Sequence, residues 1–136
     1  MTALRYLLDT NICIYIRQKR PANVFARMQE QNPGDAGLSI ISYGELSYGV
    51  AKSADPKANA DALSRFVELI PVLLLPVGAG EIYGEMRAAL ESDGSMIGSN
   101  DLWIAAHALA SGLTLVTNNV REFRRVPKLK IENWAK

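Results

Sequence analysis

The sequence predicts an α/β fold in which helices cover both faces of a parallel sheet of short strands. Two observations lead to this prediction. Short apolar runs, bounded by turn-forming or capping residues, alternate along the chain with longer segments of helical character. These runs are nearly continuous in hydrophobicity, which is typical of parallel strands buried on both sides. Such sheets bind ligands beyond the carboxyl ends of their strands, so we expect the functional residues at that edge.

The predicted elements follow one another in a regular order. The first strand has the sequence LRYLL and ends at Asp9, a residue type that begins helices. Pro21 suits the first turn of a helix, and Gly112 suits the end of one. We expect strands at 4–8, 38–41, 72–75, 113–117 and 130–132. We expect helices at 12–18, 21–31, 42–52, 58–69, 79–91, 99–111 and 119–124.

The composition fits a single globular domain over residues 1–136. Hydrophobic residues make up 49% of the chain and charged residues 21%, which argues against a disordered protein. The lone Cys13 excludes a disulfide framework, and the lone His107 argues against His-rich metal sites and Ser-His-Asp chemistry. The chain contains no apolar stretch of the roughly 20 residues that a membrane span requires, and no signal-peptide pattern. We therefore expect a cytoplasmic protein.

Three acidic residues lie close to predicted strand ends or helix starts. Asp9 follows the first strand, Glu45 follows the second, and Asp101 falls in the first turn of the 99–111 helix. Each residue also has a purely structural interpretation. Asp9 would cap a helix, Glu45 would complete a capping box opened by Ser42, and Asp101 would favour a helix dipole behind an N-cap at Ser99.

The joint position of these residues favours a metal site. Asp9, Glu45 and Asn119 all come just after predicted parallel strands, so they should meet in one crevice. Neighbouring carboxylates need a counter-charge, and Mg²⁺ or Mn²⁺ prefers oxygen ligands. Such a cation activates water and polarises a phosphoryl oxygen, which points to phosphoryl chemistry. Asn119 and Glu122 also have the spacing of a capping pair.

The basic residues are unevenly distributed, although the formal net charge is only +1. Residues 121–136 contain six basic and two acidic side chains, and a second basic group lies between residues 17 and 27. These groups are either solvated faces or phosphate contacts. The candidates for phosphate-backbone contacts are Arg17, Lys19, Arg20, Arg121, Arg124 and Arg125.

Four segments together resemble PIN-domain nucleases of the VapC toxin type. They are LLDTNICIY (7–15), SIISYGEL (39–46), IGSNDLWIAAHALA (97–110) and LVTNNVREFRRVPKLKIENW (115–134). The resemblance implies a three-layer α/β/α sandwich around a parallel sheet of about five strands. It also implies a Mg²⁺- or Mn²⁺-dependent endoribonuclease that is the toxin of a toxin–antitoxin pair.

The resemblance assigns expected roles to single residues. Asp9 and Asp101 match the direct metal ligands of the family, and Glu45 matches a carboxylate that acts through water or a second metal. These three residues are the expected catalytic and metal-binding group. The supporting residues expected around them are Thr10, Asn11, Ser99, Asn100, Thr117 and Asn119.

The resemblance also implies partners for the chain. These are an RNA substrate, with a tRNA anticodon loop suggested by the enteric-type toxins, a VapB-type antitoxin, and a second copy of the chain. The antitoxin tail would cross the acidic crevice and place an Arg against the carboxylates.

The sequence departs from the family pattern at one position and leaves one main alternative open. Many PIN domains carry a fourth acid where this chain has Asn119. The alternative function is a catalytically silent PIN-fold binding module. Phosphoaspartyl phosphatases are a more distant alternative, because they need Asp-x-Asp where this chain has Asp9-Thr10-Asn11.

Overall fold

The computed structural model describes residues 4–32 and 34–136; the first three residues of the predicted domain and Pro33 lie outside this range. Five parallel strands form one sheet in the order β3-β2-β1-β4-β5. The strands are β1 (Tyr6–Leu8), β2 (Ala36–Ser39), β3 (Val72–Leu73), β4 (Thr114–Val116) and β5 (Ile131–Glu132). The helices are α1 (Thr10–Gln18), α2 (Ala22–Gln29), α3 (Ile40–Ala51), α4 (Pro56–Leu69), α5 (Gly78–Asp93), α6 (Ser99–Ser111) and α7 (Val120–Phe123).

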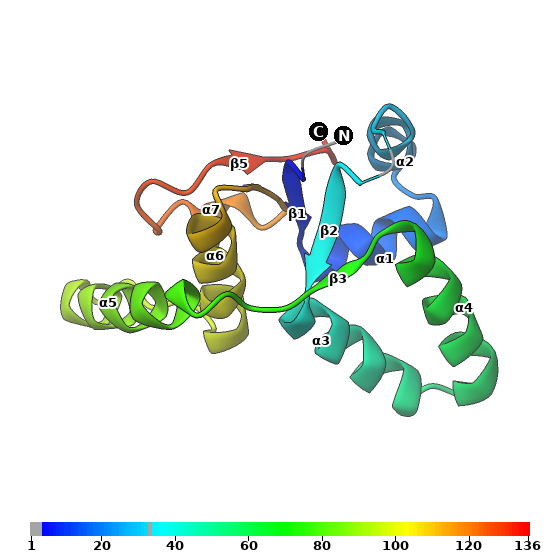
Figure 1. Ribbon diagram of the computed structural model, residues 1–136, viewed down its shortest axis with the longest axis horizontal. Coiled ribbons are helices and arrows are strands. Elements are labelled where there is room, and N and C mark those ends of the chain that lie inside the picture. Colours follow the sequence, from blue (N-terminus) through cyan, green and yellow to red (C-terminus); the bar gives the residue numbers. More distant parts are fainter. Residues whose placement is uncertain (1–3, 33) are drawn as a thin grey trace.

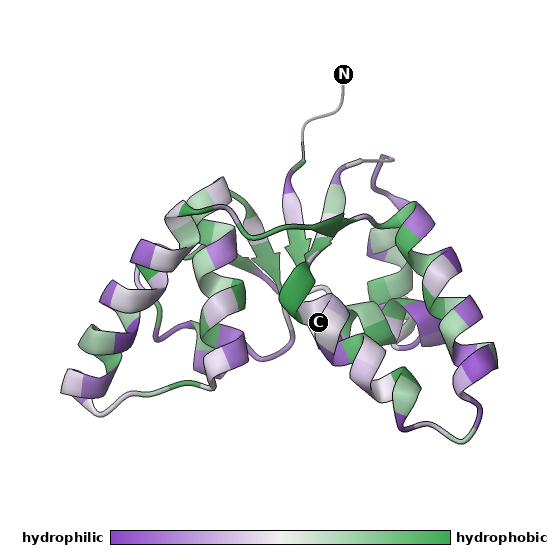
Figure 2. Cartoon of the chain, turned by 60° about the horizontal axis from the view of Figure 1, so that its bottom comes forward, coloured by the Kyte–Doolittle hydropathy of each residue, from purple (hydrophilic) through white to green (hydrophobic). Residues whose placement is uncertain are grey.

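Helices cover both faces of the sheet, as predicted. In Figure 1, α1, α2 and α4 lie on one side of the strands, and α5 and α6 lie on the other. Side chains of β1 alternate between the two layers: Tyr6 and Leu8 join one hydrophobic cluster, while Leu7 joins the other. Figure 2 shows mainly hydrophobic strands at the centre, between helices of mixed hydropathy. The predicted three-layer α/β fold is therefore confirmed.

The second strand ends earlier than predicted, and this changes the start of α3. The strand expected at 38–41 ends at Ser39, which is the N-cap of α3. The Ser39 hydroxyl accepts a hydrogen bond from the Ile41 N–H at 3.2 Å. Ser42, the predicted cap, is buried inside the helix, and its hydroxyl has no partner among the described residues. The predicted capping box is therefore wrong, and Glu45 is not engaged in capping.

The only histidine and the only cysteine of the chain both lie in the interior. His107 is 1% exposed, and its Nδ1 lies 3.0 Å from the Ser39 hydroxyl, so its expected structural role fits its position. Burial lowers the pKa of His107. Cys13 is fully buried in helix packing, as predicted, and burial raises the pKa of its thiol.

The C-terminal segment returns to the middle of the sheet. Trp134 is fully buried, and its ring centroid lies 5.2 Å from that of Tyr6 at an interplanar angle of 74°. This edge-to-face packing fixes the residues after β5 beside the first strand. Over residues 4–32 and 34–136, no helix combines the length and hydrophobicity needed to cross a bilayer.

Candidate active site

Asp9 occupies the predicted position at the carboxyl edge of the central strand. It is the N-cap of α1, and one carboxylate oxygen accepts the Thr10 N–H at 2.8 Å. The other oxygen accepts the Thr117 hydroxyl, which follows β4, also at 2.8 Å. Asp9 is only 4% exposed, and burial raises the pKa of its carboxyl, while these two hydrogen bonds oppose the rise. Capping and site formation thus use different oxygens of one side chain.

Glu45 reaches the same edge from the side of α3. Its Oε1 accepts the Thr10 hydroxyl at 2.7 Å. Thr10 therefore bonds both carboxylates, through its backbone N–H to Asp9 and through its hydroxyl to Glu45. Thr10 and Glu45 also share the wall of an open cavity of about 700 Å³ with Asn100.

Asp101 lies in the first turn of α6, as predicted, but its N-cap is Gly98 rather than Ser99. The Asp101 carboxylate makes no hydrogen bond within the described part of the chain. Its pKa is raised to about 7, first by burial and then by the charges of Asp9, Glu122 and Glu45. Like charges therefore gather at this edge of the sheet, and a bound cation would relieve their repulsion.

Glu122 is a fourth carboxylate of this cluster, and the sequence interpretation missed it. One oxygen accepts the Gly98 N–H at 3.0 Å, and the other accepts the Asn119 side-chain amide at 2.6 Å. These two bonds lower the pKa of Glu122. The spacing of Asn119 and Glu122 was the available signal, since a residue at the helix N-cap faces one three positions later. The acid absent at position 119 is thus replaced by one three residues later.

Comparison with known proteins identifies the family. The sequence model of the PIN domain family matches residues 6–129 of this chain. Ribonuclease VapC2 of Rickettsia felis is 41% identical over 132 residues, which cover 96% of this chain and 98% of that protein. The chain belongs to the VapC-type PIN-domain ribonucleases. The resemblance carried by the four sequence segments is therefore confirmed.

Other VapC-type relatives agree in sequence and in structure. The tRNA(fMet)-specific endonuclease VapC of Shigella flexneri is 41% identical, with 97% of this chain and 99% of that protein covered. The solved VapBC2 of Rickettsia felis, bound to a promoter DNA fragment, contains a chain with a TM-score of 0.88 and 39% identity, covering 98% of this chain and 99% of that one. VapBC-1 of nontypeable Haemophilus influenzae gives a TM-score of 0.90 and 36% identity, with 99% and 100% coverage.

The carboxylates of this VapC-type chain fit a hard divalent cation by charge and by chemistry. All four offer oxygen ligands, and burial together with mutual repulsion raises the pKa of Asp9 and Asp101. Within the described residues, no three Asp, Glu, His or Cys side chains already have a metal-holding arrangement. Glu45 is engaged by Thr10, and Glu122 by the hydrogen bonds from its neighbours. A cation bound among the carboxylates would offset their negative charge.

The predicted supporting residues fall into two groups. Thr10, Thr117 and Asn119 bond site carboxylates directly. Thr117 also accepts the Asn119 N–H at 2.9 Å, which links the two halves of the site. The remaining three are exposed and make no side-chain hydrogen bond among the described residues; they are Asn11, Ser99 and Asn100.

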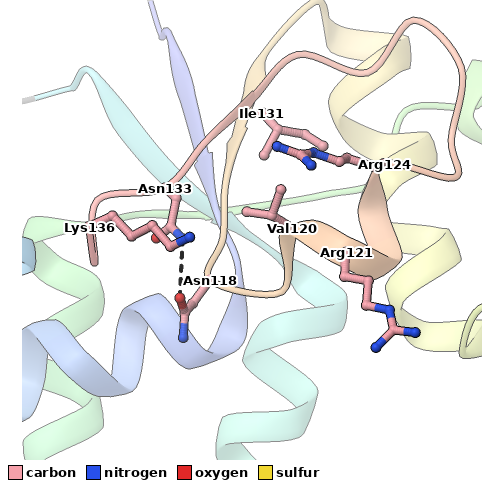
Figure 3. A pocket seen from close by; sticks show the side chains of 7 residues that line it. All are labelled: Asn118, Val120, Arg121, Arg124, Ile131, Asn133 and Lys136. Atoms are coloured by element: carbon pink, nitrogen blue, oxygen red, sulfur yellow. Dashed lines mark hydrogen bonds between the residues drawn. The ribbon is translucent and has the colours of Figure 1, made fainter.

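The six basic candidates lie in different surroundings. Arg17 lines a cavity of about 240 Å³ together with Thr10 and Glu45, so it faces the acidic edge. Arg121 and Arg124 line a separate pocket, drawn in Figure 3. The other three, Lys19, Arg20 and Arg125, are exposed. The Lys19 ammonium group lies over the Phe25 ring, and the Arg125 guanidinium donates a hydrogen bond to the Met96 carbonyl at 2.7 Å.

Proposed function

We propose that this chain is a Mg²⁺- or Mn²⁺-dependent endoribonuclease and the toxin of a toxin–antitoxin pair. The observation that carries the proposal is the carboxylate cluster at the sheet edge, where burial, and then the charges of the neighbouring carboxylates, raise the pKa of Asp101 to about 7. Asp9 and Asp101 would hold the cation, and Glu45 would complete the site. Glu122 joins them as a fourth carboxylate. When bound, the cation supplies an activated water and neutralises charge on the phosphoryl oxygens.

The chain's own residues hold the acidic groups in place. Thr117 and the Thr10 N–H fix both oxygens of Asp9. The Thr10 hydroxyl orients Glu45, and Asn119 orients Glu122. Orienting partners of this kind commonly tune metal affinity by about 10- to 100-fold. Burial of Asp9 excludes water from one side of the site, which strengthens its electrostatics.

A tRNA is the proposed substrate. Relatives from Shigella flexneri and Salmonella typhimurium are named tRNA(fMet)-specific endonucleases, at 41% and 37% identity. Proteins read RNA sequence mainly in unpaired loops, which suits an anticodon loop. Arg17 beside Glu45, with Lys19, Arg20 and the arginines of 121–125, would contact the phosphate backbone. The reaction would then take place in the cytoplasm.

A VapB-type antitoxin and a second copy of the chain are the proposed partners. Relatives from Rickettsia felis, Haemophilus influenzae and Salmonella typhimurium were solved as VapBC complexes. An antitoxin Arg placed among the carboxylates would balance their charge much as a cation does. The exposed Leu74 and Val77, at 78% and 94% exposure, support a homodimer contact.

The test is cleavage of total RNA by the purified chain with Mg²⁺ or Mn²⁺, with cut ends mapped by sequencing. We expect EDTA to abolish the cuts and Asp101→Asn to lower the rate by roughly a thousandfold or more. Asp61→Asn, an exposed change of the same type on α4, is the matched control. Equal activity of the wild type and the Asp101 variant would overturn the site. Folded, metal-binding protein without any cleavage would favour the silent binding module.

A further inference from the structure

A basic pocket of about 590 Å³ opens between the β4–α7 turn and the C-terminal segment. Its volume lies within the range of about 300–1,000 Å³ that is usual for small-molecule sites. In Figure 3, Arg121 and Arg124 come from the α7 side, and Asn133 and Lys136 come from the C-terminal side. Asn118 lies next to Asn133, and Val120 lies between the two sides.

Three cationic side chains and no acidic side chain line the pocket. Arg121, Arg124 and Lys136 line it, and none of them forms a salt bridge or side-chain hydrogen bond within residues 4–32 and 34–136. The undescribed positions are Met, Thr, Ala and Pro, so they cannot supply a carboxylate side chain. Unpaired cations around one concavity attract an anion, and guanidinium groups bind phosphate in a bidentate manner.

The inner part of the pocket is suited to a nucleobase. Val120 and Ile131 supply apolar surface. Asn133 donates to the Asn118 carbonyl oxygen at 3.2 Å, and Asn118 donates to the Tyr15 hydroxyl at 3.4 Å. An amide group offers two donors and two acceptor positions, so each side chain keeps hydrogen-bonding capacity for a ligand. Amides whose orientation is already fixed can read the edge of a base.

The pocket shares a wall with the carboxylate cluster. Three consecutive residues form this wall. Thr117 donates a hydrogen bond to Asp9, Asn118 lines the pocket, and Asn119 donates a hydrogen bond to Glu122. Farther along, Arg121 in α7 and Arg124, the C-cap of this helix, both line the pocket. A single strand with one phosphate at the carboxylates would therefore place an adjacent nucleotide at the pocket.

We propose that this pocket is a nucleotide subsite for the RNA strand, which holds a nucleotide next to the cleaved bond. Its cations bind the phosphate, and its asparagine amides contact the base. This proposal rests on the proposed function, since it deepens the contact with the same substrate. An acidic segment of a protein partner is the competing occupant, and the test distinguishes the two.

The first experiment measures binding of a short mixed-sequence single-stranded RNA to the Asp101→Asn protein in EDTA, over a range of salt. We expect Arg124→Gln to weaken binding about fivefold at 0.1 M salt and to make the slope of log K against log salt less negative by about 0.7. Arg65→Gln, an exposed arginine on α4, is the matched control and should change neither quantity. Equal behaviour of the two variants would overturn the subsite.

The second experiment tests the base contact. Asn133→Ala should change the relative affinities for the four RNA homopolymers while the salt slope stays the same, because no charge is removed. Unchanged relative affinities would overturn the base contact. Loss of antitoxin binding by Arg124→Gln with unchanged RNA binding would assign the pocket to a protein partner and overturn the proposal.

The two proposals can fail separately. If the wild type cleaves RNA and Arg124→Gln binds and cleaves it equally well, the subsite proposal is wrong and the proposed function stands. If the wild type neither binds nor cleaves RNA, the proposed function falls with it. Thermal unfolding of each variant confirms that the fold is intact.

Discussion

The segment 117–124 presents opposite charges on its two sides, and the two sides differ in burial. Thr117, Asn119 and Glu122 face the carboxylate cluster, while Arg121 and Arg124 line the basic pocket. The carboxylates are buried or half-buried, and burial together with like charge raises the pKa of Asp9 and Asp101. The arginines are exposed, and water screens their repulsion. Clustered like charge is therefore costly only where it is withdrawn from solvent.

The two sides also differ in how their groups are supported. Every oxygen of Asp9 and Glu122 accepts a hydrogen bond from a hydroxyl, an amide or a backbone N–H. The cations of the pocket have no such partners in the described residues. A preorganised acidic site therefore lies beside an adaptable basic one. This arrangement suits a reaction centre with fixed carboxylates, next to which flexible cationic side chains bind the RNA strand.

The largest effect that would sharpen this comparison comes from Glu122, the acid that the sequence interpretation missed. Glu122→Gln removes one charge from the cluster and exchanges one acceptor oxygen for a donor amide, so the Gly98 N–H and the Asn119 amide no longer each have an acceptor oxygen of their own. We expect affinity for Mg²⁺ or Mn²⁺ to fall about 10- to 100-fold, because ligand charge and outer contacts both weaken. Titration of RNA cleavage against Mg²⁺ concentration measures this shift.

The control for Glu122 is Glu68→Gln, an exposed glutamate on α4 that should leave the titration unchanged. Partial recovery of the Glu122 variant at high Mg²⁺ would support a role in holding the cation. A titration identical to that of the wild type would mean that Glu122 has no part in cation binding, and the acidic side of segment 117–124 would then not include it.

The second effect is on stability without metal, and it follows from Asp101. Its pKa is raised from 3.8 to about 7, so the folded chain binds more protons than the unfolded chain between these values. Stability should therefore fall as the pH rises through this window. We expect a loss of about 1 kcal/mol between about pH 5 and pH 7.5 in EDTA, reduced from the full value because the group is partly solvated. Chemical denaturation at several pH values measures it.

Asp101→Asn should abolish most of this pH dependence, whereas Asp61→Asn should retain it. Two lowered pKa values act in the opposite sense: that of Glu122 only as the pH falls below 4.5, and that of the buried His107 as the pH falls below 6.5, within the same window. The difference between the wild type and Asp101→Asn therefore isolates the contribution of Asp101. The same pH dependence between about pH 5 and pH 7.5 in the wild type and in Asp101→Asn would contradict the claim that the ionised Asp101 destabilises the folded chain.

The sequence was sufficient for the fold and for three of the four acids. Short apolar runs predicted all five strands, because burial on both faces leaves a strong local signal. The boundary at Ser39 could not be predicted, since Ile40 and Ile41 suit a strand as well as a helix. Only the packing of α3 decides between them.

Glu122 shows why one part of the site was not predicted. Its local pattern with Asn119 indicated a capping pair, and the two side chains are indeed bonded. Glu122 also accepts a hydrogen bond from the Gly98 N–H at the start of α6, and these two residues lie 24 positions apart in the sequence. The basic pocket was missed for the same reason, because it joins Asn118 to Asn133 across 15 residues. Local patterns identify caps, but they cannot show which caps meet in space.

The smallest effect tests the other side of the comparison. Arg121→Gln removes a charge from the basic pocket, as Asp101→Asn removes one from the acidic cluster. Because Arg121 is exposed, we expect the free energy of unfolding to change by less than about 0.5 kcal/mol, equally at about pH 5 and pH 7.5. The same denaturation series measures it. If Arg121→Gln raised the free energy of unfolding as much as Asp101→Asn does, repulsion among the cations would also destabilise the fold. Burial would then not explain the difference between the two sides.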